Sequence, residues 1–145
     1  MIQKLILAFS ADHAGYAMKQ DLIEYAQELG HVILDFGVQN IEPVDYPDLV
    51  PSVVGSIINA QAHFGIVICG SGIGMDIAAN RHAGIRAALC HCSLIATRAR
   101  QHNDANILCL GAQFIGNLVA RECLLKFTTT NFEGGRHQRR VDKLG

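Results

Sequence analysis

Short apolar runs alternate with segments of helical hydrophobic spacing along this chain of 145 residues. A run that is apolar throughout is typical of a strand buried on both faces, and apolar residues about three to four positions apart are typical of a packed helix. Strands joined by helices in this way form parallel sheets with right-handed crossovers. We therefore expect an α/β fold with an open, five-stranded parallel sheet covered by helices on both faces.

The boundaries follow from the same pattern. Strands are predicted over residues 4–9, 31–36, 64–69, 85–89 and 106–110, and helices over residues 14–29, 48–61, 73–80, 93–101 and 117–128. Analogy with other doubly wound domains of this size predicts the strand order 2-1-3-4-5.

Composition limits the classes of protein that remain. Half of the residues are hydrophobic and 17% are charged, which excludes a disordered chain and supplies one core. We expect a single domain over residues 1–145 with a basic arm over residues 130–145. A formal net charge of −1 argues against a nucleic-acid partner, because phosphate-tracking surfaces carry a basic excess. With no membrane-length apolar run and no visible signal peptide, we expect a cytoplasmic protein with reduced cysteines and no membrane partner.

The strongest motif is a glycine loop, Cys69–Gly74, between the third strand and the next helix. Its alternating glycines allow successive backbone N–H groups to point at one concave spot, where they would hold an anion or a developing oxyanion. Met75 stands where a dinucleotide fingerprint has Gly or Ala, and the Gly-Lys-Ser/Thr of a P-loop is absent. The loop therefore predicts an anion site rather than a nucleotide site.

Cys69, at the mouth of this loop, has two interpretations. It is either a small buried hydrophobe that ends a strand or a thiol that the following N–H groups activate as a base or nucleophile. Cys90 and Cys92 flank a single histidine, which is a weak zinc pattern, so no metal site is expected.

Two histidines stand beside polar partners. His13 adjoins Asp12 and His102 adjoins Asn103, and we predict that both pairs lie at the edge where the parallel strands end. Ligands of such sheets bind at that edge, and histidine transfers protons near neutral pH.

The last dozen residues are basic. They include four basic residues and a single acidic one: Arg136, Arg139, Arg140 and Lys143 against Asp142. The segment is either a solvated tail or an anion-binding arm that closes over a site.

Several segments, in order from the first strand to the tail, resemble the B-type ribose-5-phosphate isomerases and the related galactose-6-phosphate isomerase subunits. They are Asp12–Gly15, Asp45–Pro47, Cys69–Gly74, Ala78–Asn80, Gly84–Ala87, Gln101–Asn106 and Glu133–Val141. The resemblance implies a Rossmann-like three-layer α/β/α sandwich. It also implies a homodimer or tetramer with active sites at the subunit interface.

The implied activity is an aldose–ketose isomerisation of ribose 5-phosphate and ribulose 5-phosphate in the pentose phosphate pathway. The reaction would pass through an enediol without a metal or other cofactor. Carried over residue by residue, Cys69 would be the base, and His102 with Ser71 would open the furanose ring. Substrate contacts would come from Asp12, His13, Tyr46, Gly70, Ser71, Gly72, Ile73, Gly74, Asn103, Gln113, Arg136, His137 and Arg140, of which His13, Arg136, His137 and Arg140 would surround the phosphate.

Two positions depart from the family pattern. Gln113 stands where the family has an arginine that contacts the phosphate, and Asp76 adds a carboxylate beside the loop helix. One cation fewer and one anion more both weaken phosphate binding. The alternatives are therefore the same chemistry on a hexose 6-phosphate or tetrose 4-phosphate, or a non-catalytic sugar-phosphate-binding partner subunit.

Overall fold

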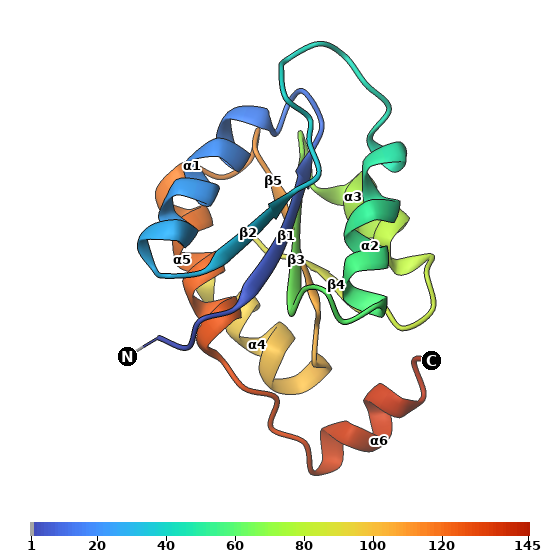
Figure 1. Ribbon diagram of the computed structural model, residues 1–145. Helices are drawn as coiled ribbons and strands as arrows, with labels where there is room; N and C mark the ends of the chain where they lie inside the picture. Colours follow the sequence, from blue (N-terminus) through green and yellow to red (C-terminus); the bar gives the residue numbers. More distant parts are fainter. Residues whose placement is uncertain (1) are drawn as a thin grey trace.

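The structure, a computed structural model, describes residues 2–145 as a five-stranded sheet between two layers of helices (Figure 1). Neighbouring strands are parallel throughout, which confirms the predicted α/β/α sandwich. The strands are β1 (Ile6–Ala11), β2 (Val32–Asp35), β3 (Phe64–Cys69), β4 (Ala87–Leu89) and β5 (Ile107–Gly111).

The helices cover both faces of the sheet. They are α1 (Tyr16–Glu28), a 3-10 turn η1 (Tyr46–Leu49), α2 (Val50–Ile58), α3 (Ile73–Asn80), α4 (Ser93–Asn103), α5 (Asn117–Thr129) and α6 (Arg136–Asp142). None of the helices within residues 2–145 is both long enough and apolar enough to cross a membrane.

The period-two alternation of the strands divides the core into two halves. Leu7 and Phe9 of β1 point to the face covered by α1, α4 and α5, whereas Ala8 points to the face covered by α2 and α3. Successive side chains of a strand point to opposite faces, and both faces here are buried. This explains why the strands are continuous apolar runs in the sequence.

The strand order is β2-β1-β3-β5-β4, so the predicted order 2-1-3-4-5 is wrong at its end. β5 lies between β3 and β4. All five residues of β5 are buried, whereas β4 has three residues that are only partly covered. The longer and more apolar strand takes the interior position, and the short strand becomes the edge.

Two other segments differ from the prediction. The helix expected over residues 48–61 is divided into η1 and the shorter α2, with Pro47 and Pro51 in the first turns of the two pieces, where a missing N–H is tolerated. The basic end of the chain is not a loose tail, because residues 136–142 form α6.

Candidate active site

The glycine loop lies at the carboxyl edge, the edge of the sheet at which the strands end. Gly72 is the N-cap of α3 and has a φ of 78°, a left-handed conformation that favours glycine. A Cβ on Gly72 would fall 2.5 Å from Leu89 Cδ1 and 2.8 Å from the Leu110 carbonyl carbon. The loop therefore needs glycine here both for its backbone conformation and for its close approach to β4 and β5.

Cys69 ends β3 directly below this loop, with 4% of its surface exposed. Its Sγ accepts a hydrogen bond from the Gly72 backbone N–H at 3.2 Å. The Ile73 N–H in turn bonds Ser71 Oγ at 3.2 Å. A sulfur atom and a hydroxyl oxygen thus lie among N–H groups at the start of a helix, an arrangement that stabilises negative charge on a bound oxygen.

The other four cysteines differ from Cys69. Burial raises the pKa of Cys90 to about 12 and that of Cys123 to about 11, and it raises the pKa of Cys109 well above its ordinary value. These three thiols are part of the core, as Cys69 is, but within residues 2–145 it is Cys69 whose sulfur accepts a hydrogen bond from the glycine loop. Cys92 is exposed at the N-cap of α4.

Two side chains border the loop. The ring of Tyr46 covers Gly74, where a Cβ would fall 2.5 Å from Tyr46 Cζ. The amide of Gln113 lies against Gly70, where a Cβ would fall 2.9 Å from Gln113 Oε1, and the Gln113 N–H bonds the Gly70 carbonyl at 2.9 Å. The position that departs from the family pattern therefore lies beside the anion loop.

The end of β1 adds an acid and an imidazole to the same edge. Asp12 is buried, and its Oδ1 accepts the N–H groups of Ala14 and Gly15 at 3.0 and 3.1 Å. His13 Nδ1 accepts the N–H of Val44 at 3.3 Å. These bonds hold the start of α1 and the loop before η1 against the carboxyl edge.

Asp76, in the first turn of α3, faces the sheet. Burial raises the pKa of its carboxyl, against the opposing effects of hydrogen bonds with Cys109 and the Leu89 backbone. Its side chain is therefore directed toward β4 and β5, and its negative charge is less favoured than that of an exposed aspartate.

The prediction that His102 and Asn103 lie at the same edge is wrong for a single chain. Both are in the last turn of α4, which ends before β5 begins at Ile107. They are therefore at the amino edge, where the strands start, while Gly111 pairs with Cys69 at the carboxyl edge. The five residues of β5 separate the edges by about 13 Å.

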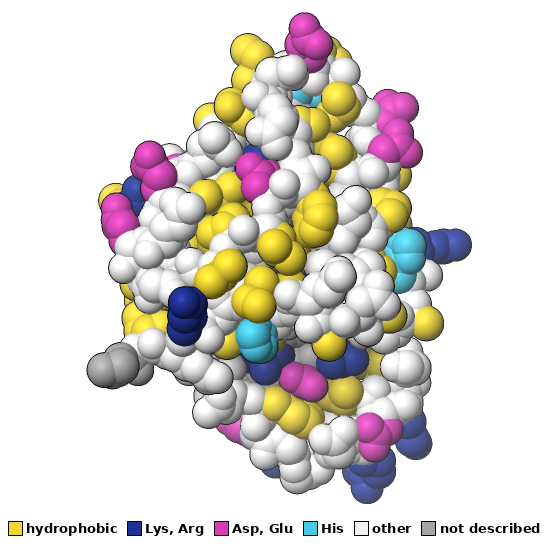
Figure 2. Space-filling view, viewed as in Figure 1, with side chains coloured by type: hydrophobic (Ala, Val, Ile, Leu, Met, Phe, Trp, Pro, Cys, Tyr) yellow, Lys and Arg dark blue, Asp and Glu magenta, His cyan; other side chains and the backbone are white. Residues whose placement is uncertain are grey.

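The basic arm is at the amino edge as well (Figure 1). Arg136, His137 and Arg140 belong to α6, which packs against α4. In the space-filling view, Lys and Arg side chains gather at the end of the molecule where α6 lies (Figure 2). The structure thus brings together two groups of predicted site residues, the thiol and loop at one edge and the imidazoles and arginines at the other.

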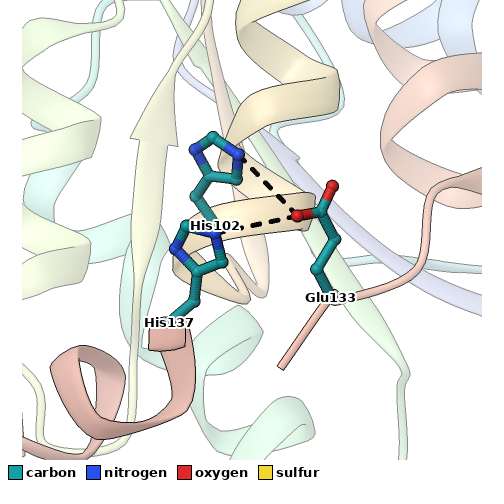
Figure 3. A group of neighbouring side chains, drawn as sticks. All are labelled: His102, Glu133 and His137. Carbon is teal, nitrogen blue, oxygen red and sulfur yellow. Dashed lines mark ion pairs between the residues drawn. The ribbon is translucent and has the colours of Figure 1, made fainter. Parts of the chain in front are cut away.

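The amino-edge group surrounds a pocket of about 300 Å³ lined by His102, Asn103, His137, Arg140, Val141 and Leu144. The rings of His102 and His137 are stacked, with centroids 4.2 Å apart and planes inclined by 10°. Glu133 Oε2 lies 4.0 Å from His102 Nε2 and 3.7 Å from His137 Nε2 (Figure 3).

Glu133 was not among the site residues expected from the sequence. Glu133 precedes α6, and Gly134 and Gly135, both with positive φ, lie between it and the helix, so no helical spacing in the sequence indicates its contact with His137. Within residues 2–145, His102, Glu133 and His137 are also the group of potential metal ligands whose donor atoms converge, all within 4.8 Å of one another.

Comparison with known proteins identifies the family. Residues 7–144 match the family described as Ribose/Galactose Isomerase. The chain belongs to this family. A crystal structure of a ribose 5-phosphate isomerase from Thermotoga maritima has a TM-score of 0.96 and 44% identity, and 98% of each chain is covered.

Two curated relatives match this isomerase over nearly their whole length. Ribose-5-phosphate isomerase B of Escherichia coli is 37% identical over 138 residues, which cover 95% of this chain and 93% of that protein. D-erythrulose-4-phosphate isomerase of Pectobacterium atrosepticum is 37% identical over 142 residues, which cover 97% of this chain and 93% of that protein. These matches confirm the resemblance drawn from the motifs, and the chain is a sugar phosphate isomerase of this family.

Proposed function

We propose that this isomerase interconverts ribose 5-phosphate and ribulose 5-phosphate through an enediol, with Cys69 as the base. The observation that carries the proposal is the position of Cys69 Sγ, which is 3.2 Å from the Gly72 N–H at the start of α3. Proton abstraction next to a carbonyl needs a base and a donor array where the negative charge develops. Cys69 and the loop N–H groups supply both. The relatives named ribose-5-phosphate isomerase support this substrate.

The chemical step moves one proton between two carbons. Cys69 takes the proton from C2 of the open-chain aldose, the C–H electrons form a C1–C2 double bond, and the C1 carbonyl oxygen becomes an oxyanion. The N–H groups of the loop stabilise that oxyanion. The proton of the C2 hydroxyl then passes to the C1 oxygen, the C2 carbonyl forms, and the double-bond electrons take the first proton back from Cys69 onto C1, which gives the ketose. His102, with Ser71, assists the preceding step by donating a proton to the ring oxygen as the furanose opens.

We further propose that two copies of the chain form the complete site. Cys69 and His102 act on one substrate, yet one chain holds them at opposite edges of its sheet. A two-fold axis perpendicular to the strands would place the carboxyl edge of one copy beside the amino edge of the other.

An exposed apolar face is available for this contact. It lies around the edge strand β4 and includes large side chains of α3, α4, the turn after β5 and the start of α5 that are 40–79% exposed: Ile73, Ile77, Leu94, Ile95, Phe114 and Leu118. Contiguous exposed apolar patches mark interaction surfaces. The occupant that we propose is a second copy, because its amino edge brings the imidazole and the arginines that the carboxyl edge needs.

The second candidate function is the same reaction on another sugar phosphate. Gln113, neutral and exposed beside Gly70, favours it, and one relative of equal identity is named for a tetrose phosphate. Parallel assays of the purified chain on pentose, tetrose and hexose phosphates test both candidates. Activity on none of them by the chain alone would favour the non-catalytic partner subunit instead.

Gln113→Arg is expected to lower the KM for ribose 5-phosphate. A hydrogen bond to a charged group is worth about 1.5–3 kcal/mol, less at an exposed position, so we expect roughly a three- to thirty-fold change. The effect should shrink at high salt because it is electrostatic. Gln113→Met, of similar size without a cation, is the matched control, and Arg140→Ala should weaken binding. An unchanged KM for both arginine variants would place the phosphate elsewhere.

Removal of divalent metal is expected to leave the rate unchanged. In the proposed mechanism the oxyanion is held by backbone N–H groups, so no ion is needed as a Lewis acid. The measurement is the rate before and after extended dialysis against a chelator. A loss of rate that one divalent ion restores would contradict the thiol mechanism.

A further inference from the structure

We propose that Glu133 is a positioning residue that holds Nε2 of His102 and of His137 as N–H donors, so that Nδ1 of His102 exchanges the proton with the sugar. This inference rests on the proposed function, in which His102 opens the furanose ring. No role was expected for Glu133 from the sequence, although it lies within the basic arm, just before α6.

The geometry centres on one oxygen atom. Glu133 Oε2 faces both Nε2 atoms, at 4.0 Å for His102 and 3.7 Å for His137. The other ring nitrogen of each imidazole points away from Glu133 (Figure 3). A partner on one nitrogen of a histidine decides which nitrogen carries the proton. A carboxylate on the Nε2 side therefore favours the Nε2–H tautomer and leaves Nδ1 for the substrate.

The backbone keeps Glu133 in this position. Its N–H bonds the carbonyl of Gln101, at the end of α4, at 3.0 Å. His137 is buried, and its stacking on His102 joins α6 to α4. The carboxylate is thus tied to the same helix that carries His102 rather than to a separate mobile segment.

A divalent metal fits this cluster less well than a proton. The two imidazole planes are nearly parallel and their centroids are 4.2 Å apart, so a single ion cannot lie in the plane of both rings. Metal–nitrogen bonds of about 2.1 Å lie along the in-plane lone pair. Arg136 and Arg140 also act on His137 as positive charges, and they would repel a second cation.

The groups around the imidazole pair shift the pKa of His137 in opposite directions. Burial lowers the pKa of His137, and His102, Arg136 and Arg140 lower it further, while Glu133 raises it. On α4, Arg98 bonds Gln101 and Arg100 bonds Asp104. α5 packs on α4 through apolar side chains of the core. Glu133 is therefore the anion that faces the imidazole pair within the described chain.

The decisive experiment follows the imidazoles directly by NMR in the ¹⁵N-histidine-labelled protein. In Glu133→Gln, we expect the ¹⁵N shifts of His102 and of His137 each to show a smaller Nε2–H population, because the carboxylate that faces both Nε2 atoms is lost. Glu133→Asp should show a smaller loss at both histidines. Glu24→Gln, which removes an exposed carboxylate from α1, should change neither.

Kinetics add a second measurement. Loss of the carboxylate removes the group that favours the productive tautomer of His102, so kcat on the cyclic substrate should fall in Glu133→Gln. An acyclic analogue should be affected much less. Unchanged tautomer populations would overturn the role of Glu133. A wild-type chain without isomerase activity would contradict the proposed function, while the NMR result would still decide the role of Glu133.

Zinc binding by His102, Glu133 and His137 is the competing interpretation of this cluster. Addition of ZnCl₂ to the labelled protein should leave the His102 and His137 signals in place at micromolar concentrations. Saturable shifts at such concentrations that disappear in Glu133→Gln would make the cluster a metal site and overturn the proton-positioning role.

Discussion

Cys69→Ala is expected to fold, to bind a substrate analogue and to lose most of the isomerase activity. A positioned general base contributes about 10²–10⁴-fold to a rate, and no other thiol takes its place. The thiols of Cys90, Cys109 and Cys123 are in the core with raised pKa values. The measurement is kcat on ribose 5-phosphate, with circular dichroism to check the fold. Retention of more than about a tenth of the activity would contradict the assignment.

Cys92→Ser is the matched control. Cys92 is exposed at the N-cap of α4, where serine is favoured, so this variant should keep its activity. In the Cys92→Ser background, alkylation with iodoacetamide should inactivate the protein, and substrate should protect it. Alkylated enzyme that remains active would exclude a thiol base even if Cys69→Ala were unstable.

A mixture of two inactive variants is expected to regain activity. Cys69→Ala removes the base from the carboxyl edge, and His102→Ala removes the imidazole from the amino edge. In a mixed dimer, one of the two sites combines the intact edges of both chains. Random exchange makes half of the dimers mixed, so about a quarter of the wild-type activity should return.

The control mixture combines two variants of the same edge. Cys69→Ala and Ser71→Ala both damage the carboxyl edge, so every site in their mixed dimer carries one lesion. Subunit exchange should then give no gain over the mean of the separate variants. If Cys69→Ala with His102→Ala also gave no gain after verified exchange, each site would be built within one chain.

The sequence was sufficient to predict the layers of the fold but not the complete order of the strands. Continuous apolar runs such as Phe64–Cys69 become strands covered on both faces, and their ends agree with the structure. The positions of β4 and β5 depend on relative burial, which a local pattern does not record. Ala87–Leu89 is short and partly covered, and it yields the interior place to β5.

The sequence likewise predicted the local part of the site but not the parts that depend on long-range packing. The Cys69–Gly74 loop is local, so its position between β3 and α3 could be predicted from the glycine spacing and the neighbouring apolar run. His102 was assigned to the wrong edge because it precedes β5 along the chain, and residues that precede a parallel strand lie where strands begin. Glu133 was missed because its relation to His102 depends on α6 packing against α4, which is a long-range contact.

The two separated edges have an evolutionary consequence. In the proposed dimer, each chain supplies a thiol half to one site and an imidazole half to the other, so both halves of every copy would be under selection. After a gene duplication, one copy would be free to lose its thiol half and the other its imidazole half. The product would be an obligate pair of unlike chains with a single working site. Cys69 and His102 lie at opposite ends of one sheet. Such a pair of unlike chains could therefore arise by loss of one catalytic residue from each copy, without the gain of a new one.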